Sequence, residues 1–263
     1  MRETVRRHLG KLITGTAVAV AAAAVTVGLV LPGSGGSGDR TTGAGSAEQN
    51  AIPKDGVYED APAEGAKGVG SDPLTPDEVK RAKSIATAGN VRLSARDVEG
   101  DRGPQLLSTN LTEDADPAAA AGTAAARRAD IVYYDYKDDV LVTKTVNLST
   151  GKVENTDTSH GVQPPAAKDE QTEAAQLLIA DPLGADLKKD YKHAMGKELT
   201  SPDQLSLSSF VFKKQNVEQL PAALSKCGDH RCISLVTKVV NGPWIDTRKL
   251  IVDLSARSVT RLP

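Results

Sequence analysis

Aromatic residues are scarce in this chain of 263 residues, since Phe, Trp and Tyr make up 3% of it, with one Trp and two Phe. A hydrophobic core must therefore be built from Val, Leu, Ile and Ala. The chain also has almost no net charge, because it contains 32 basic and 34 acidic residues. The N-terminal residues are basic and the remainder is mildly acidic, which excludes an electrostatic surface for nucleic acid, so no nucleic-acid partner is expected.

A long uncharged run, Leu12 to Leu31, follows Arg6, Arg7 and Lys11. Twenty helical residues would span about 30 Å of hydrocarbon. Paired arginines before a weakly apolar, Ala-rich segment are typical of a twin-arginine signal, whose cargo folds before export. An ordinary secretory signal and an uncleaved anchor are the alternatives. We expect residues 1–31 to direct export, leaving the protein secreted or anchored facing outside, with the membrane as a partner if the segment is not cleaved.

The next segment, residues 32–71, consists mainly of Gly, Ser, Ala, Asp and Pro and has almost no large apolar side chain. Such a segment cannot bury enough apolar surface to offset its ordering entropy, so we expect a flexible linker. Folded structure is predicted to begin with a helix in which Thr75 is the N-cap, Pro76 the first helical residue and Glu78 the partner in a capping box.

A short pattern occurs twice, at Val146–Val153 and at Val252–Val259, and in both copies an apolar run ends in a polar turn. A helical pattern followed by several strand patterns precedes each copy. The sequence therefore predicts an α+β fold of two consecutive small modules, residues 72–163 and 164–263, each with helices packed on an antiparallel sheet. The expected helices begin at Thr75, Lys168 and Leu183, and the expected strands are 91–95, 106–111, 131–136, 140–148, 152–155, 205–212, 232–240, 250–254 and 258–262.

The clearest alternation lies in the hairpin from Ile131 to Leu148. Apolar residues recur at every second position on both sides of a turn at residues 137–139, which favours an antiparallel pair. One register then predicts that a packed face is made of Val132, Tyr134, Val140 and Val142.

The two cysteines of the chain, Cys227 and Cys232, flank Gly-Asp-His-Arg. In an exported protein such a pair is expected to form a local disulfide. A metal site that uses both cysteines with His230 and Asp229 is the first alternative, but a structural zinc site would need further ligands elsewhere. A redox-active pair is the second, although its usual spacing has two intervening residues.

Other candidates for chemistry are sparse. No serine lies in a Gly-x-Ser-x-Gly elbow, and His160 and His193 are isolated, so a hydrolase is not indicated. Trp244 follows a Gly-Pro turn and is predicted to cap the hydrophobic core, with a ligand platform as the alternative. We therefore expect no catalytic residues, no cofactor and no metal.

Four segments together resemble the small non-catalytic N-terminal domains of copper amine oxidases, and the resemblance extends from about Asp72 to Tyr191. These segments are Arg127–Asp135, Val146–Val153, Gly161–Pro165 and Leu178–Pro182. The resemblance implies two α+β modules that lie outside a catalytic domain.

The chain lacks what the chemistry of that family needs. Its quinone arises from a Tyr that follows Asn, and none of the five tyrosines here does so. Its copper is bound by three histidines, two of them one residue apart, and this chain has no His-x-His. The resemblance therefore implies a shared scaffold without amine oxidase activity, quinone or copper.

Three functions remain open on the sequence. The first is an exported, non-enzymatic binding or interaction ectodomain with a partner in the cell envelope. The second is an accessory or vestigial subunit of a copper amine oxidase, and the third is an enzyme with an unrecognised site. Open sheet edges would give the first two a route to partner binding.

Overall fold

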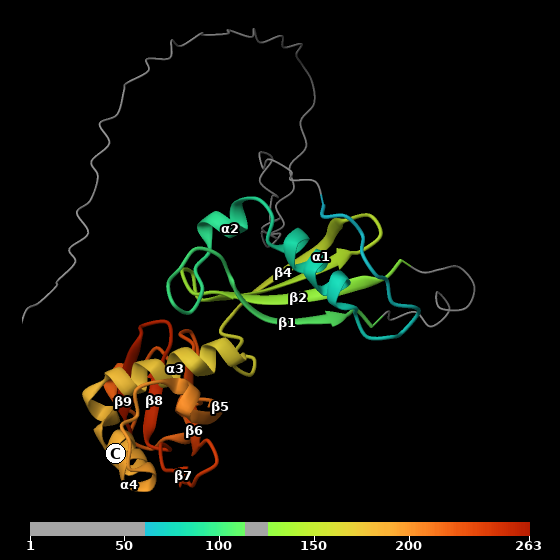
Figure 1. Ribbon diagram of the computed structural model, residues 1–263. Helices are drawn as coiled ribbons and strands as arrows, with labels where there is room; N and C mark the ends of the chain where they lie inside the picture. Colours follow the sequence, from blue (N-terminus) through green and yellow to red (C-terminus); the bar gives the residue numbers. More distant parts are fainter. Residues whose placement is uncertain (1–60, 114–125) are drawn as a thin grey trace, which may run out of the picture. The chain divides into compact units, whose positions relative to one another are not determined.

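The computed structural model describes residues 61–113 and 126–263 (Figure 1). The predicted export signal, with Arg6 and Arg7, and most of the predicted linker lie outside the described residues. Within the described ranges, no helix combines the length and the apolar character needed to cross a membrane.

The first module contains a four-stranded antiparallel sheet in the order β1-β2-β3-β4. Its elements are α1 (Pro76–Ala86), α2 (Asn90–Ser94), β1 (Gln105–Leu111), β2 (Arg128–Asp135), β3 (Val140–Asn147) and β4 (Lys152–His160).

The second module contains a five-stranded antiparallel sheet in the order β5-β6-β8-β9, and β7 pairs with β6. Its longer elements are α3 (Lys168–Ala180), α4 (Ala185–Met195), β5 (Leu205–Val211), β6 (Cys232–Val239), β7 (Trp244–Ile245), β8 (Leu250–Asp253) and β9 (Ser258–Arg261). Short 3-10 turns lie at η2 (Pro182–Gly184), η3 (Pro202–Gln204), η4 (Lys214–Asn216) and η5 (Ala222–Leu224). The predicted α+β class, with helices on two antiparallel sheets, is confirmed.

Helix α1 begins at the predicted capping box. The Thr75 hydroxyl accepts a hydrogen bond from the Glu78 amide at 3.2 Å, and the Glu78 carboxylate accepts one from the Thr75 amide at 2.9 Å. The helix then buries Ala82, Ile85 and Ala86 against the first sheet. The sheet side of this core consists of Ala129, Ile131, Tyr133, Val140, Val142 and Val146.

Helices α3 and α4 cover one face of the second sheet, as Figure 1 shows. Asp181 ends α3, and its carboxylate accepts from the Leu183 amide at 2.8 Å, which starts the next turn at Pro182. The second core contains, among others, Ala174, Ala175, Leu178, Leu187, Tyr191, Ile233, Leu235, Val239 and Val252.

The two sheets have the same topology, because β1, β2, β3 and β4 correspond in order to β5, β6, β8 and β9. The repeated sequence pattern forms the turn between the third and fourth of these strands in each sheet. In the first, the Leu148 amide donates to the Arg127 carbonyl at 3.0 Å, and in the second the Leu254 amide donates to the Arg231 carbonyl at 2.9 Å. The repeat predicted from sequence is therefore a structural repeat.

The hairpin of β2 and β3 has a register that differs from the prediction. Asp135 pairs with Val140 and Tyr133 with Val142, because four residues form the turn and Asp139 has a φ of 52°. A register shift of one residue moves every side chain of one strand to the opposite face relative to its partner strand. Val140 and Val142 therefore share the packed face with Ile131 and Tyr133, and the predicted pairing of that face with Val132 and Tyr134 was wrong.

Two other expectations change at the start of the first module. The predicted strand at residues 91–95 is helix α2 followed by a turn, since Gly89 has a φ of 70° and redirects the chain after α1. The last residues of the predicted linker contact α1, because the Ala66 amide donates to the Asp77 carboxylate at 2.8 Å.

A charge at Val142 should be far more destabilising than the same charge at Thr143. Val142 is 7% exposed in the core under α1, whereas Thr143 lies on the opposite face of β3. We expect Val142→Asp to lower the free energy of unfolding by about 3 kcal/mol or more, and Thr143→Asp to change it by less than about 1 kcal/mol. Urea denaturation measures both, and equal losses would contradict the register.

Candidate functional site

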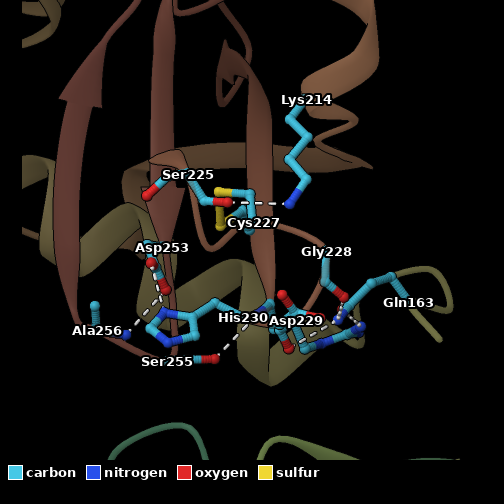
Figure 2. The surroundings of a disulfide bond; sticks show 12 residues. Gln163, Lys214, Ser225, Cys227, Gly228, Asp229, His230, Asp253, Ser255 and Ala256 are labelled. Carbon is cyan, nitrogen blue, oxygen red and sulfur yellow. Dashed lines mark hydrogen bonds and ion pairs between the residues drawn. A yellow bond between two sulfur atoms is a disulfide. The ribbon is translucent and has the colours of Figure 1, made fainter. Parts of the chain in front are cut away.

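The most concentrated group of reactive side chains surrounds the loop from Cys227 to Cys232 (Figure 2). The two sulfur atoms are joined in a disulfide with an S–S distance of 2.08 Å, and both cysteines are buried. The pair packs in a small apolar cluster with Leu224 and Ile251. The disulfide thus closes the loop that leads into β6.

The side chains of this loop are poorly suited to bind a metal ion. Ligand atoms of Cys227, Cys232 and Asp253 lie within 4.8 Å of one another. In the disulfide, however, neither sulfur is a thiolate, and the thiolate is the form that binds zinc. Asp253 is also engaged, since its carboxylate contacts His230 Nδ1 at 2.9 Å and accepts from the Ala256 amide at 2.9 Å. His230 and Asp229, which the metal alternative requires, do not belong to the converging group.

Arg231 lies next to the disulfide and makes the largest polar network of the second module. Its side chain and that of Glu170 are both 0% exposed. The guanidinium donates from Nε and Nη2 to the two carboxylate oxygens of Glu170, at 2.5 and 2.8 Å. The remaining N–H groups donate to the carbonyls of Pro164 and Pro165, at 3.0 and 3.2 Å, and to the Gln163 side chain at 3.3 Å. A buried ion pair thereby fastens the segment before α3 to the start of β6.

Two tyrosines of the hairpin of β2 and β3, two residues apart, complete this network. The Tyr136 hydroxyl donates to Glu170 at 2.6 Å, and the Tyr134 ring lies beneath the Arg231 guanidinium at 5.3 Å. Burial, reinforced by the Glu170 carboxylate, raises the pKa of Tyr136 well above its usual range. Burial, the largest single effect, lowers the pKa of Arg231, but the hydrogen bonds and charge of Glu170 together with the two tyrosines outweigh it, and the pKa is raised. The network is therefore a fixed ion pair with neutral phenols around it.

The first module has an equivalent pair. Arg127, directly before β2, donates from Nε and Nη2 to Glu78 at 2.8 and 3.0 Å, and from Nη1 to the Gly70 carbonyl at 2.6 Å. Burial would raise the pKa of Glu78, but bonds from Arg127 and from the Thr75 amide hold it below its usual value. In each module, an arginine before the second strand thus binds a glutamate in the first turn of the helix, which also accepts from the N-cap amide, and carbonyls of the segment before that helix.

These arginines were missed in the sequence. Arg231 and Glu170 are 61 residues apart, so local patterns do not connect them. A signal did exist: each module has a glutamate in the first turn of its helix, and an arginine one residue before its second strand in the shared order, β2 or β6.

His230 is held between two carboxylates. Its Nδ1 contacts Asp253 at 2.9 Å and its Nε2 lies 4.0 Å from Asp139. The Ser255 hydroxyl donates to Asp139 and accepts from the Arg231 amide. The serine hydroxyl is therefore directed to a carboxylate and not to the imidazole, which is not the arrangement of an activated nucleophile.

The other predicted candidates are dispersed. His160 ends β4 and His193 lies in α4, both exposed. Trp244 was expected to cap the core, but it is 65% exposed. In the two-residue strand β7, the neighbouring Ile245 faces the core instead, because successive side chains of a strand point to opposite faces.

A hollow of about 230 Å³ lies between α1 and the segment that precedes it. Arg127 and Glu78 line it, and both are committed to their ion pair. Arg81 lines it as well and donates from Nε to the Leu148 carbonyl at 3.0 Å. The hollow is therefore bordered by side chains that hold the module together.

No protein-family model and no curated protein matches the sequence. Among solved structures, 74% of this chain aligns with 30% of the chain of a copper-containing benzylamine oxidase from Hansenula polymorpha. The sequence identity is 14% and the TM-score is 0.42. The aligned part is thus less than a third of that enzyme's chain, and the similarity is a distant structural resemblance from which no activity follows.

Breaking the buried pair should be costly. Arg231→Met leaves the Glu170 carboxylate buried without its partner, so we expect a loss of about 3–5 kcal/mol in the free energy of unfolding. The double variant Arg231→Met/Glu170→Leu should recover much of that loss. Arg248→Met is the matched control, since the Arg248–Asp246 pair is exposed and its loss should have little effect. Chemical denaturation measures all three, and a small effect of Arg231→Met would contradict the assignment.

The disulfide should make a smaller contribution. By chain entropy, a loop of this length stabilises the folded state by about 2 kcal/mol. We expect Cys227→Ser/Cys232→Ser to lower the free energy of unfolding by that amount under oxidising conditions and to abolish the effect of a reductant. Protein purified without reductant should have no thiol that reacts under denaturing conditions, and two reactive thiols would contradict the prediction.

Proposed function

We propose that this protein is an exported, non-enzymatic ectodomain that binds a component of the cell envelope through the second module. Its buried charged groups serve the scaffold. Glu78 and Glu170 hold arginines, and Asp253 holds His230. A partner is therefore expected to bind at the surface, where side chains are accessible and are not needed to hold the fold together.

The single observation that carries the proposal is an exposed face of the second sheet. We call it the Trp244 face, and it lies opposite α3 and α4. Trp244 is 65% exposed, and Lys238 Nζ lies 5.5 Å from the centre of its ring. The same face carries Ser206, Ser208, Phe210, Ser234 and Val236, by the register of β5, β6 and β7.

These residue types suit a binding surface. Trp is among the residues that contribute most to binding, because it buries a large rigid area at low entropic cost. Placed over the ring, Lys238 adds a cation, and the outward-facing residues of β5, β6 and β7 named above include no acid. A partner with an apolar or planar group beside an anionic group would fit this face.

Export is the other part of the proposal. It rests on the N-terminal sequence and is compatible with a disulfide, which persists in oxidising compartments. We also propose that the protein has no enzymatic activity. Two observations support this: Ser255 is not directed to His230, and the cysteine loop is not suited to bind a metal.

Binding of the protein to washed cell envelopes tests the function. We expect Trp244→Ala and Lys238→Glu to weaken saturable binding at least about tenfold, which corresponds to 1.4 kcal/mol or more. Val162→Ala is the matched control, since Val162 is 47% exposed and lies outside the Trp244 face. Envelope binding that is the same for all four proteins, or that is absent, would refute the proposal.

A further inference from the structure

The described sheets end in the edge strands β1, β4, β5 and β9, and three of them carry features that oppose pairing with another chain. β1 has an irregular register between Leu106 and Ser108. β4 carries Lys152, Glu154 and Asp157. β9 is four residues long, and its Arg261 donates back to Asp186.

β5 has none of these protections. Its seven residues, Leu205–Val211, include no charge and no proline, and they pair with β6 in an uninterrupted register. Phe210 is 67% exposed on this strand. A long, regular and uncharged edge is a template for an added strand.

The backbone hydrogen bonds show which residues of β5 face the open side. The Val240 amide donates to the Gln204 carbonyl, and the Phe212 amide donates to the Cys232 carbonyl. Residues of an antiparallel strand alternate between bonding one neighbour and the other. The even-numbered residues of β5 therefore bond β6, and the backbone groups that point outward belong to Leu205, Leu207, Ser209 and Val211.

We infer that β5 pairs with β5 of a second copy of this chain, antiparallel and around a two-fold axis through Ser208. In this register Leu205 faces Val211 of the other copy, and Leu207 faces Ser209. All four outward-facing residues are then hydrogen-bonded, and the seven-residue strands overlap completely. Shifting the axis by one residue to Leu207 or Ser209 leaves part of the strand unpaired.

Charges beyond the strand favour the same register. Asp203 and Lys213 are both exposed, one before and one after β5. Asp203 lies in η3 before the strand and Lys213 lies just after it, so the antiparallel arrangement brings Asp203 of each copy to the end of β5 where Lys213 of the other copy lies, and opposite charges meet at both ends of the contact. Phe210 of each copy lies beside Ser206 of the other, which covers part of its exposed ring.

The result is a continuous sheet of two five-stranded halves with isologous contacts. A two-fold axis perpendicular to the sheet leaves the Trp244 faces of both copies on the same side. The dimer does not depend on the proposed binding function, and Trp244→Ala should not change its mass.

Disulfide trapping tests the register. Ser208 faces itself across the axis as a non-hydrogen-bonded pair with a Cα–Cα distance of about 4.5 Å, which suits a disulfide. Ser206 and its counterpart would be about 13 Å apart. We expect Ser208→Cys to give an intermolecular disulfide under mild oxidation. Ser206→Cys, its matched control on the same exposed face, should not.

Charge substitutions test the assembly in solution by light scattering. The native protein should have twice the mass of the 27.5 kDa chain. Ser208→Lys sets two lysines opposite each other and should give the single-chain mass, whereas Ser208→Thr should remain dimeric. Lys213→Glu should weaken the dimer, and Asp203→Lys/Lys213→Glu should restore it, because the exchange re-forms both pairs.

A native protein with the single-chain mass, and equally poor cross-linking of Ser208→Cys and Ser206→Cys, would overturn the inference. The open edge of β5 would then be available to a strand of a different protein. A dimer that Ser208→Lys leaves intact would also overturn it, because the contact would lie elsewhere.

Discussion

The structure depends on a buried arginine that binds a glutamate in the first turn of a helix. The pair Arg231–Glu170 has no exposed surface, so both ions have lost their hydration, and the bidentate contact with three further acceptors must replace it. Taking two charges out of water costs several kcal/mol per ion, and such a pair adds little net stability over apolar residues. Its value is geometric, because the Arg231 side chain joins the start of α3, the segment that leads into α3 and the chain immediately before β6.

The two copies of this device are not equivalent. Arg127 and Glu78 retain 12% and 6% of their side-chain exposure, whereas Arg231 and Glu170 retain none. The difference arises because Tyr136, from the chain leaving β2, covers Glu170 and donates to it. The Arg231–Glu170 pair therefore also joins the hairpin of β2 and β3 to α3. The same arginine–glutamate contact that stabilises a single helix start in the first module thus connects successive parts of the chain in the second.

Local features of the sequence were sufficient for much of the fold. Each of these features depends on a few neighbouring residues: the capping box at Thr75 and Glu78, the break at Asp181-Pro182, the alternating strands and the repeated turn. What failed was the parity of the β2–β3 hairpin, because the alternating pattern does not show whether Tyr136 ends the strand or begins the turn. The partner of Arg231 was also out of reach, since burial of an ion pair is decided by the tertiary structure.

The repeat supplies an internal comparison for the open edge. β1 and β5 occupy the same position in the two sheets, so the topology gives both an unpaired row of backbone groups. β1 interrupts that row with a register irregularity, and β5 does not. Because protection of an exposed edge opposes unwanted pairing, its absence at one of two equivalent positions is expected where pairing is used. The flanking Asp203 and Lys213 favour this inference, since an antiparallel pair of β5 strands brings the acidic end of one strand to the basic end of the other.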